Sequence, residues 1–142
     1  DLDDRTVADM AQAWPRIEII HLMAQFPTHR PRNTLACLYS FARNCACLRM
    51  LCIAFDATIA LVEVDSANHH FQQHALISLH VEHSPIATPI SVARFLSQVF
   101  PVLSTICTRW DYAKNSQELE APAARQVCDQ WNEAKTLLNT MR

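Results

Sequence analysis

Glycine is absent from this sequence of 142 residues, so a glycine-rich phosphate-binding loop of the usual form cannot be built. Turns must instead use asparagine, aspartate, serine and proline. No apolar run approaches the roughly 18 residues that a membrane-spanning helix needs, and the acidic residues 1–4 do not resemble a signal peptide. With 12 Lys and Arg against 14 Asp and Glu, the chain lacks the basic footprint of nucleic-acid-binding proteins. We therefore expect neither a membrane nor a nucleic acid as partner.

The cysteines form no regular framework and no C-x-x-C motif. All six lie scattered through apolar stretches: Cys37, Cys45, Cys47, Cys52, Cys107 and Cys128. Such thiols usually behave as small apolar side chains in a reducing compartment. The sequence therefore predicts reduced cysteines and a cytoplasmic or nuclear protein.

A short pattern of apolar residues occurs four times along the chain. Its copies are Ile17-Ile20-Leu22-Gln25, Leu48-Leu51-Ile53-Asp56, Leu76-Leu79-Val81-Ser84 and Leu103-Ile106-Thr108-Asp111. Their first residues are 31, 28 and 27 positions apart. A period of roughly 20–30 residues is typical of solenoids, and leucine-rich repeats have this strand signature.

Apolar residues at helical spacing lie between these strands. We expect helices near residues 4–14, 34–45, 89–100 and 122–141, and strands near 16–23, 48–55, 76–84 and 103–110. Alternation of strands and helices predicts a parallel sheet with right-handed crossovers. The predicted fold is thus α/β: a short leucine-rich-repeat-like solenoid of about four parallel strands on the concave side, with helices on the convex side. Residues 1–142 would form one domain, capped by the helix at about 122–141, with Trp131 and Leu138 packed over the fourth strand.

Several short runs resemble the leucine-rich-repeat region of fungal F-box proteins. They are residues 13–17 (AWPRI), 55–58 (FDAT), 79–86 (LHVEHSPI), 92–96 (VARFL) and 100–101 (FP). The resemblance implies a repeat region that recruits protein substrates to a cullin-type ubiquitin ligase. An F-box would then lie upstream in a longer parent protein, or the chain would work without one.

The strand alignment also predicts which side chains share the concave face, because alternate residues of a strand point to opposite faces. The expected binding face comprises His21, Met23, Met50, Cys52, Ser78, His80, Glu82, Thr105, Cys107 and Arg109. Its middle column is His21, Cys52, His80 and Cys107. A thiolate stabilised by His80 would be reactive, whereas the alternative is a set of slow, partly buried thiols.

Two further polar groups bear on function. Glu82 and Arg109 should face each other as an exposed ion pair on neighbouring strands. Asp56, Ser84 and Asp111 occupy the position where a repeat bonds its neighbour's backbone, so we expect them to be structural. His69, His70 and His74 form a histidine-rich insert near Glu63 and Asp65, but without a metal-ligand motif such as H-E-x-x-H.

The sequence predicts a non-catalytic module that binds a protein partner, without metal or cofactor. Two alternatives remain open: a small metal-dependent enzyme that uses the concave-face or insert histidines, and a self-associating structural or storage protein. The first strand would lie at an unpaired sheet edge, which predicts a homodimer or an upstream domain there.

Overall fold

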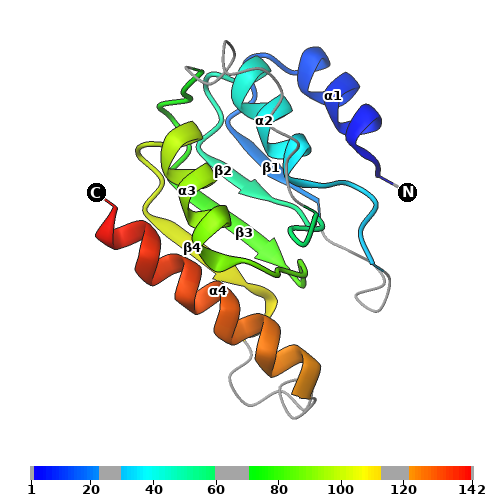
Figure 1. The fold of residues 1–142 in the computed structure, drawn as a ribbon. Coiled ribbons are helices and arrows are strands. Elements are labelled where there is room, and N and C mark those ends of the chain that lie inside the picture. The colour runs from blue at the N-terminus through cyan, green and yellow to red at the C-terminus, as the bar shows by residue number, and fades with distance from the viewer. Residues whose placement is uncertain (1, 23–29, 60–70, 113–121, 142) are drawn as a thin grey trace.

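The computed structural model describes residues 2–22, 30–59, 71–112 and 122–141, and these residues form the helices and strands of Figure 1. In chain order the elements are α1 (Asp4–Ala13), β1 (Ile19–His21), α2 (Leu35–Asn44), β2 (Met50–Cys52), β3 (Ser78–Glu82), α3 (Pro89–Val99), β4 (Thr105–Thr108), the 3₁₀ helix η2 (Arg109–Tyr112) and α4 (Pro122–Thr140). None of the helices within these ranges is long and apolar enough to cross a membrane.

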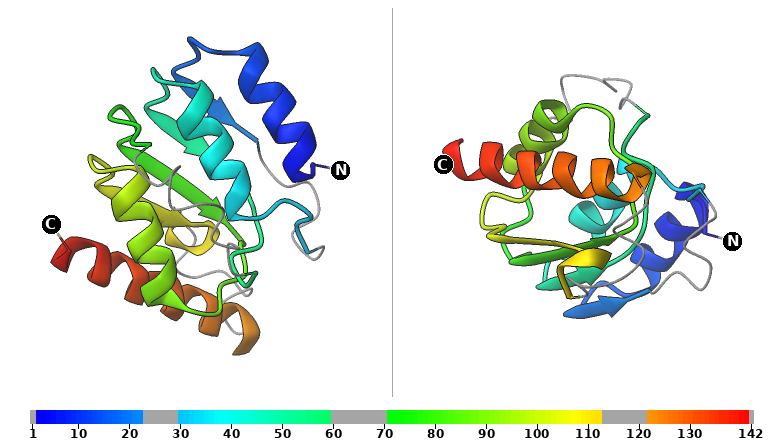
Figure 2. Two further views of the ribbon diagram at one scale, coloured as in Figure 1. Left: turned by 45° about the horizontal axis from the view of Figure 1, so that its top comes forward. Right: turned by 90° about the horizontal axis from the view of Figure 1, so that it is seen from below.

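The strands form one parallel sheet with the order β1-β2-β3-β4. This confirms the predicted α/β class, the parallel pairing and the neighbour relations of consecutive strands. The described helices lie on one face of the sheet (Figure 2). The strands are shorter than predicted, at three to five residues each, because only the centre of each apolar run joins the ladder.

Two helices, α1 and α2, begin after residues whose side chains replace missing backbone partners. Asp3 accepts a hydrogen bond from the Thr6 amide at 2.8 Å, and Thr34 accepts one from the Ala36 amide at 3.2 Å. Pro89 opens α3, where its missing N–H costs nothing. The Asp4 carboxylate also bonds the amide and the hydroxyl of Thr34, at 2.7 and 2.8 Å, so α1 is fixed to the start of α2.

The repeated apolar positions form the core between sheet and helices. In the second and third copies the first three positions are at most 1 % exposed: Leu48, Leu51, Ile53, Leu76, Leu79 and Val81. The helices add their apolar stripes, including Phe41 of α2 and Leu96 of α3, both fully buried. The first three positions of the repeated pattern therefore mark the side chains that hold each strand to the helix layer.

Buried polar side chains form hydrogen bonds between the segments that flank neighbouring strands. The Ser84 hydroxyl accepts a hydrogen bond from the Phe55 amide at 2.9 Å, and the Asn33 amide donates to the Ala54 carbonyl at 2.8 Å. Gln73 is 2 % exposed; it donates to the carbonyls of Cys45 and Leu48 and accepts from the amides of residues 75 and 76. These bonds satisfy backbone groups that the sheet leaves unpaired in the interior.

The helix α4 packs against α3 and β4, and its Trp131 is fully buried. Its indole N–H donates to the Ser84 carbonyl at 2.8 Å, and its ring meets that of Phe55 edge-to-face, with 6.0 Å between centroids. Leu138 does lie beside Ile106 of β4. Trp131 thus joins α4 to residues that follow β2 and β3.

Candidate functional site on the sheet face opposite the helices

The predicted middle column forms in the expected register. His21 pairs with Cys52, Cys52 with His80, and His80 with Cys107. The residues before them in the strands, including Ile20 and Leu79, are buried in the helix-side core. Because successive side chains alternate between faces, the column lies on the opposite face. We call this surface, with His21, Cys52, His80 and Cys107 at its centre, the ladder face.

Exposure differs along the ladder face. His21 and Thr105 are exposed, whereas Met50, Ser78, His80, Cys107 and Arg109 are half-buried. Cys52 is only 3 % exposed, so the prediction that it presents itself on a binding surface is wrong. It lies on an interior strand between two larger imidazole side chains. The predicted site residue Met23 falls outside the described residues.

Glu82 is the largest departure from the predicted face. A register shift between His80 and Glu82 places Glu82 opposite Thr108 instead of Arg109. Glu82 has a left-handed backbone, with φ of 54°, and is 8 % exposed. Its carboxylate lies 3.9 Å from the Arg109 guanidinium. The predicted contact with Arg109 is thus present, but its carboxylate partner is buried, and the expectation of a fully exposed pair is wrong.

The left-handed conformation turns the Glu82 side chain toward β2. The Cys52 thiol donates a hydrogen bond to the Glu82 carboxylate, with 3.3 Å between sulfur and oxygen. Burial raises the pKa of the Cys52 thiol to about 12, and the adjacent Glu82 adds to this by its hydrogen bond and its negative charge. Of the two alternatives, Cys52 fits the slow, buried thiol and not the reactive thiolate, since a thiol with that pKa is protonated at neutral pH.

The remaining thiols are also unpaired with one another. All six cysteines are free, as predicted, and Cys47 is the exposed one. Burial raises the pKa of the Cys37 thiol to about 12 and also raises the pKa of Cys45.

The histidines do not gather around a common point in the described part of the chain. Within it, no group of three or more His, Cys, Asp or Glu side chains could hold a metal ion. His69 and His70 of the predicted insert, with Glu63 and Asp65, lie outside the described residues, and His74 lies within them. The four-residue column itself is too extended for a single ion, because neighbouring strands are about 4.8 Å apart.

Asp56, Ser84 and Asp111 behave as structural side chains. Asp56 accepts from Arg30 Nε at 2.6 Å and from the Thr58 amide at 2.9 Å, and it is 3 % exposed. Asp111 accepts from the Thr108 amide at 2.6 Å. Burial alone would raise the pKa of Asp56, but the hydrogen bonds from Arg30 and Thr58 outweigh it and hold the pKa below its ordinary value. Arg30 was missed by sequence reasoning, since a loop arginine carries no signal of its distant partner.

The fold and the ladder face together define an α/β protein whose parallel sheet is covered by helices on one face and carries mixed polar side chains on the other. No protein-family model, curated protein or solved structure matched the chain.

Proposed function

We propose that the chain is a non-catalytic protein-interaction module, a short leucine-rich-repeat-like solenoid whose ladder face is its concave binding surface. The observation that carries this proposal is the unbroken register of His21, Cys52, His80 and Cys107 across the sheet. The strands follow one another across the sheet in chain order, and the described helices lie on one face of it, which supports the solenoid. A protein partner is favoured because the face combines an exposed imidazole, hydroxyls and a guanidinium along a continuous surface.

Catalysis is not part of the proposal, because the cysteine at the centre of the face is buried and has a raised pKa. The cellular setting rests on the resemblance alone. It is recognition of protein substrates for a ubiquitin ligase in the cytoplasm or nucleus, and this setting predicts that partners of the ladder face are degraded.

Site-specific photo-crosslinking in cells tests the binding face. A photoreactive amino acid at Thr105, which is exposed on the ladder face, should crosslink a defined protein; the same group at Gln98, which is exposed on α3, should not. Substitution of a second ladder-face residue, His21→Asp, should abolish the crosslink from position 105. Crosslinks of equal yield from both positions would overturn the proposed face.

The ligase setting has a separate readout. The crosslinked partner should have a longer half-life in cells that carry His21→Asp than in wild-type cells. An unchanged half-life, with the crosslink lost, would leave the binding face in place and refute the ligase setting.

A further inference from the structure

The outer edge of β4 is the second edge of the sheet. The Thr105 amide donates inward, to the Ile77 carbonyl at 3.1 Å. In a parallel ladder successive residues alternate between the two sides, so the N–H and C=O of Ile106 point outward. Within the described ranges no hydrogen bond from outside the sheet reaches them. The next outward amide, that of Thr108, is already bonded to Asp111.

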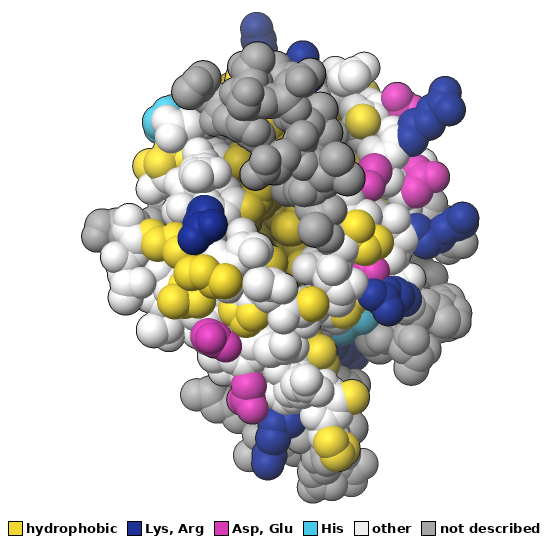
Figure 3. All heavy atoms as spheres, in the orientation of Figure 1, with side chains coloured by type: hydrophobic (Ala, Val, Ile, Leu, Met, Phe, Trp, Pro, Cys, Tyr) yellow, Lys and Arg dark blue, Asp and Glu magenta, His cyan; other side chains and the backbone are white. Residues whose placement is uncertain are grey.

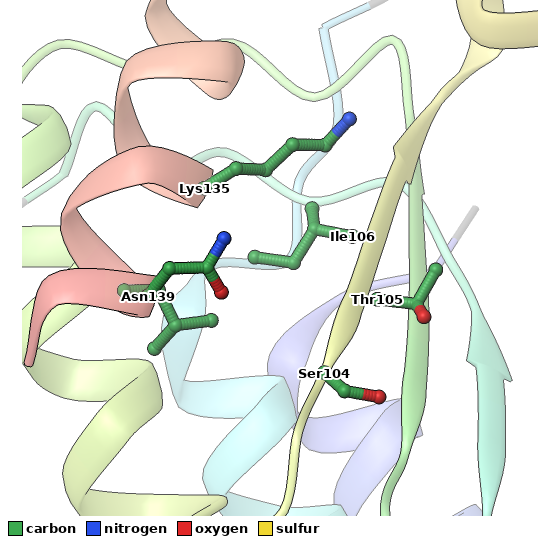
Figure 4. Close-up of a pocket in the computed structure, with 6 residues that line it drawn as sticks. Ser104, Thr105, Ile106, Lys135 and Asn139 are labelled. Carbon is green, nitrogen blue, oxygen red and sulfur yellow. The ribbon is translucent and has the colours of Figure 1, made fainter. Parts of the chain in front are cut away.

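An open groove of about 210 Å³ lies along this edge, between β4 and α4. Lys135 and Asn139 extend from α4 toward β4, and Ile106 extends from β4 toward α4 (Figure 4). Ile106 and Leu138 give the groove apolar walls, and Ser104 and Thr105 line it from the strand. Lys135 supplies the positive charge of the lining, and none of the lining residues is acidic.

We propose that this groove binds an extended, acidic peptide segment of a partner protein, which adds to β4 as a further parallel strand. The outward N–H and C=O of Ile106 would form hydrogen bonds with a C=O and an N–H of the peptide backbone, as in other cases of strand addition to a sheet edge. An apolar side chain of the peptide would contact Ile106 and Leu138. An acidic side chain would approach Lys135, whose ammonium lies at the groove, 3.3 Å from Asp111.

This surface shares Thr105 with the ladder face, but otherwise it uses the edge of the sheet and the side of α4. Asp111 limits the length of the free edge of β4. Because the Thr108 amide is bonded to Asp111, only Ile106 is left, within the described strand, to pair with the incoming peptide. The edge therefore favours a short segment held partly by α4 over open-ended pairing with other sheets.

Fluorescence polarisation with labelled peptides tests the proposal on the full chain. The probe is a peptide that alternates valine and glutamate. Two matched peptides serve as comparisons: one with lysine in place of glutamate, and one with alternate backbone amides N-methylated. The first probe should bind with saturation, the lysine peptide about tenfold more weakly and the methylated peptide not measurably, because strand addition needs free amides.

Variants at exposed or half-exposed positions of α4 locate the site. Asn139→Tyr should fill the groove and weaken binding at least about tenfold, whereas Thr136→Tyr, at an exposed position outside the groove, should not. Lys135→Glu should reduce the preference for glutamate over lysine, whereas Arg125→Glu makes the same charge change on the same helix away from the groove.

Three results would overturn the proposal: no binding of the valine–glutamate peptide, equal binding of its methylated form, or equal effects of the groove variants and their controls. Occupation by β1 of a second copy would also overturn it. In that case light scattering would show association that Asn139→Tyr abolishes, and the peptide would fail to compete.

Discussion

At the scale of single residues, Glu82 stands out because a glutamate adopts a conformation that suits glycine. Its φ of 54° lies in the left-handed region, where the clash of Cβ with the following carbonyl oxygen costs about 1–2 kcal/mol. The chain contains no glycine to place there. Residues in such a conformation persist when surrounding contacts over-determine them, and here these are the contacts with Cys52 and Arg109.

Two substitutions separate the backbone conformation of Glu82 from its carboxylate. Glu82→Ala and Glu82→Gly both remove the carboxylate, but only glycine relaxes the left-handed backbone. We expect Glu82→Gly to be more stable than Glu82→Ala by roughly 1 kcal/mol in urea denaturation. If the alanine variant were the more stable of the two, the left-handed conformation of residue 82 would be wrong.

The thiols should react in the order of their exposure and acidity. Alkylation of native protein followed by peptide mapping should modify Cys47 first, and Cys37, Cys45 and Cys52 last. Glu82→Gln removes the negative charge beside Cys52 and should accelerate its labelling, while leaving Cys37 unchanged. Labelling of Cys52 as fast as that of Cys47 would contradict its burial.

Asp56 should make stability depend on pH in the acid range. Its folded pKa lies below the ordinary value of 3.8. The carboxylate therefore stabilises the fold fully above that value, and its contribution is lost as the pH falls through the folded pKa. The difference in unfolding free energy between wild type and Asp56→Asn should be largest near pH 7 and should shrink below about pH 3.8.

The control for this experiment is Asp9→Asn, which removes a carboxylate at an exposed position of α1. It should change stability little at either pH. A wild-type advantage over Asp56→Asn that persisted unchanged at low pH would mean that the carboxylate does not contribute through its charge.

At the scale of elements, one buried tryptophan joins α4 to the rest of the fold. Trp131 is fully buried between Phe55 and the Ser84 carbonyl. Ser84 in turn bonds the amide of Phe55. One side chain of α4 thus contacts the connections that follow two different strands.

Loss of this side chain should destabilise the whole fold. Trp131→Ala should lower the free energy of unfolding by roughly 3–5 kcal/mol. Trp131→Phe keeps an aromatic ring but leaves the Ser84 carbonyl without its donor, and should cost about 1–3 kcal/mol. Chemical denaturation measures both. A cost below about 1 kcal/mol for the alanine variant would mean that α4 contributes little to the fold.

At the scale of the whole molecule, β1 and β4 form the two edges of the sheet. Ile19 of β1 is 55 % exposed, and an exposed apolar residue on an edge strand favours pairing with another chain. We therefore predict a homodimer through β1, or an upstream domain in a longer parent protein. Light scattering should show concentration-dependent association that Ile19→Lys abolishes, while Val102→Lys, at another exposed apolar position, serves as the control. A monomer at all concentrations would exclude the dimer.

The parallel sheet, its strand order and the ladder register followed from the sequence, because the apolar triplets recur at nearly equal spacing. The register shift at Glu82 could not be predicted, since it depends on contacts with Cys52 of β2 and Arg109 of η2. The contacts of Gln73 and Trp131 could not be predicted for the same reason. Their partners are distant in sequence, and a buried glutamine has no local pattern that separates it from a solvent-exposed one.

The strand order has a mechanical consequence. The chain enters at one side of the sheet and leaves at the other, as the positions of the two ends show (Figure 1). Figure 3 shows the outer surface of the molecule from the same side, where hydrophobic side chains lie among charged ones. A force that pulls the two ends apart therefore acts across the strands and loads the hydrogen bonds of one strand pair at a time. Under tension the molecule should open by peeling from an edge, at lower force than a sheet whose terminal strands are neighbours and must shear all their bonds together.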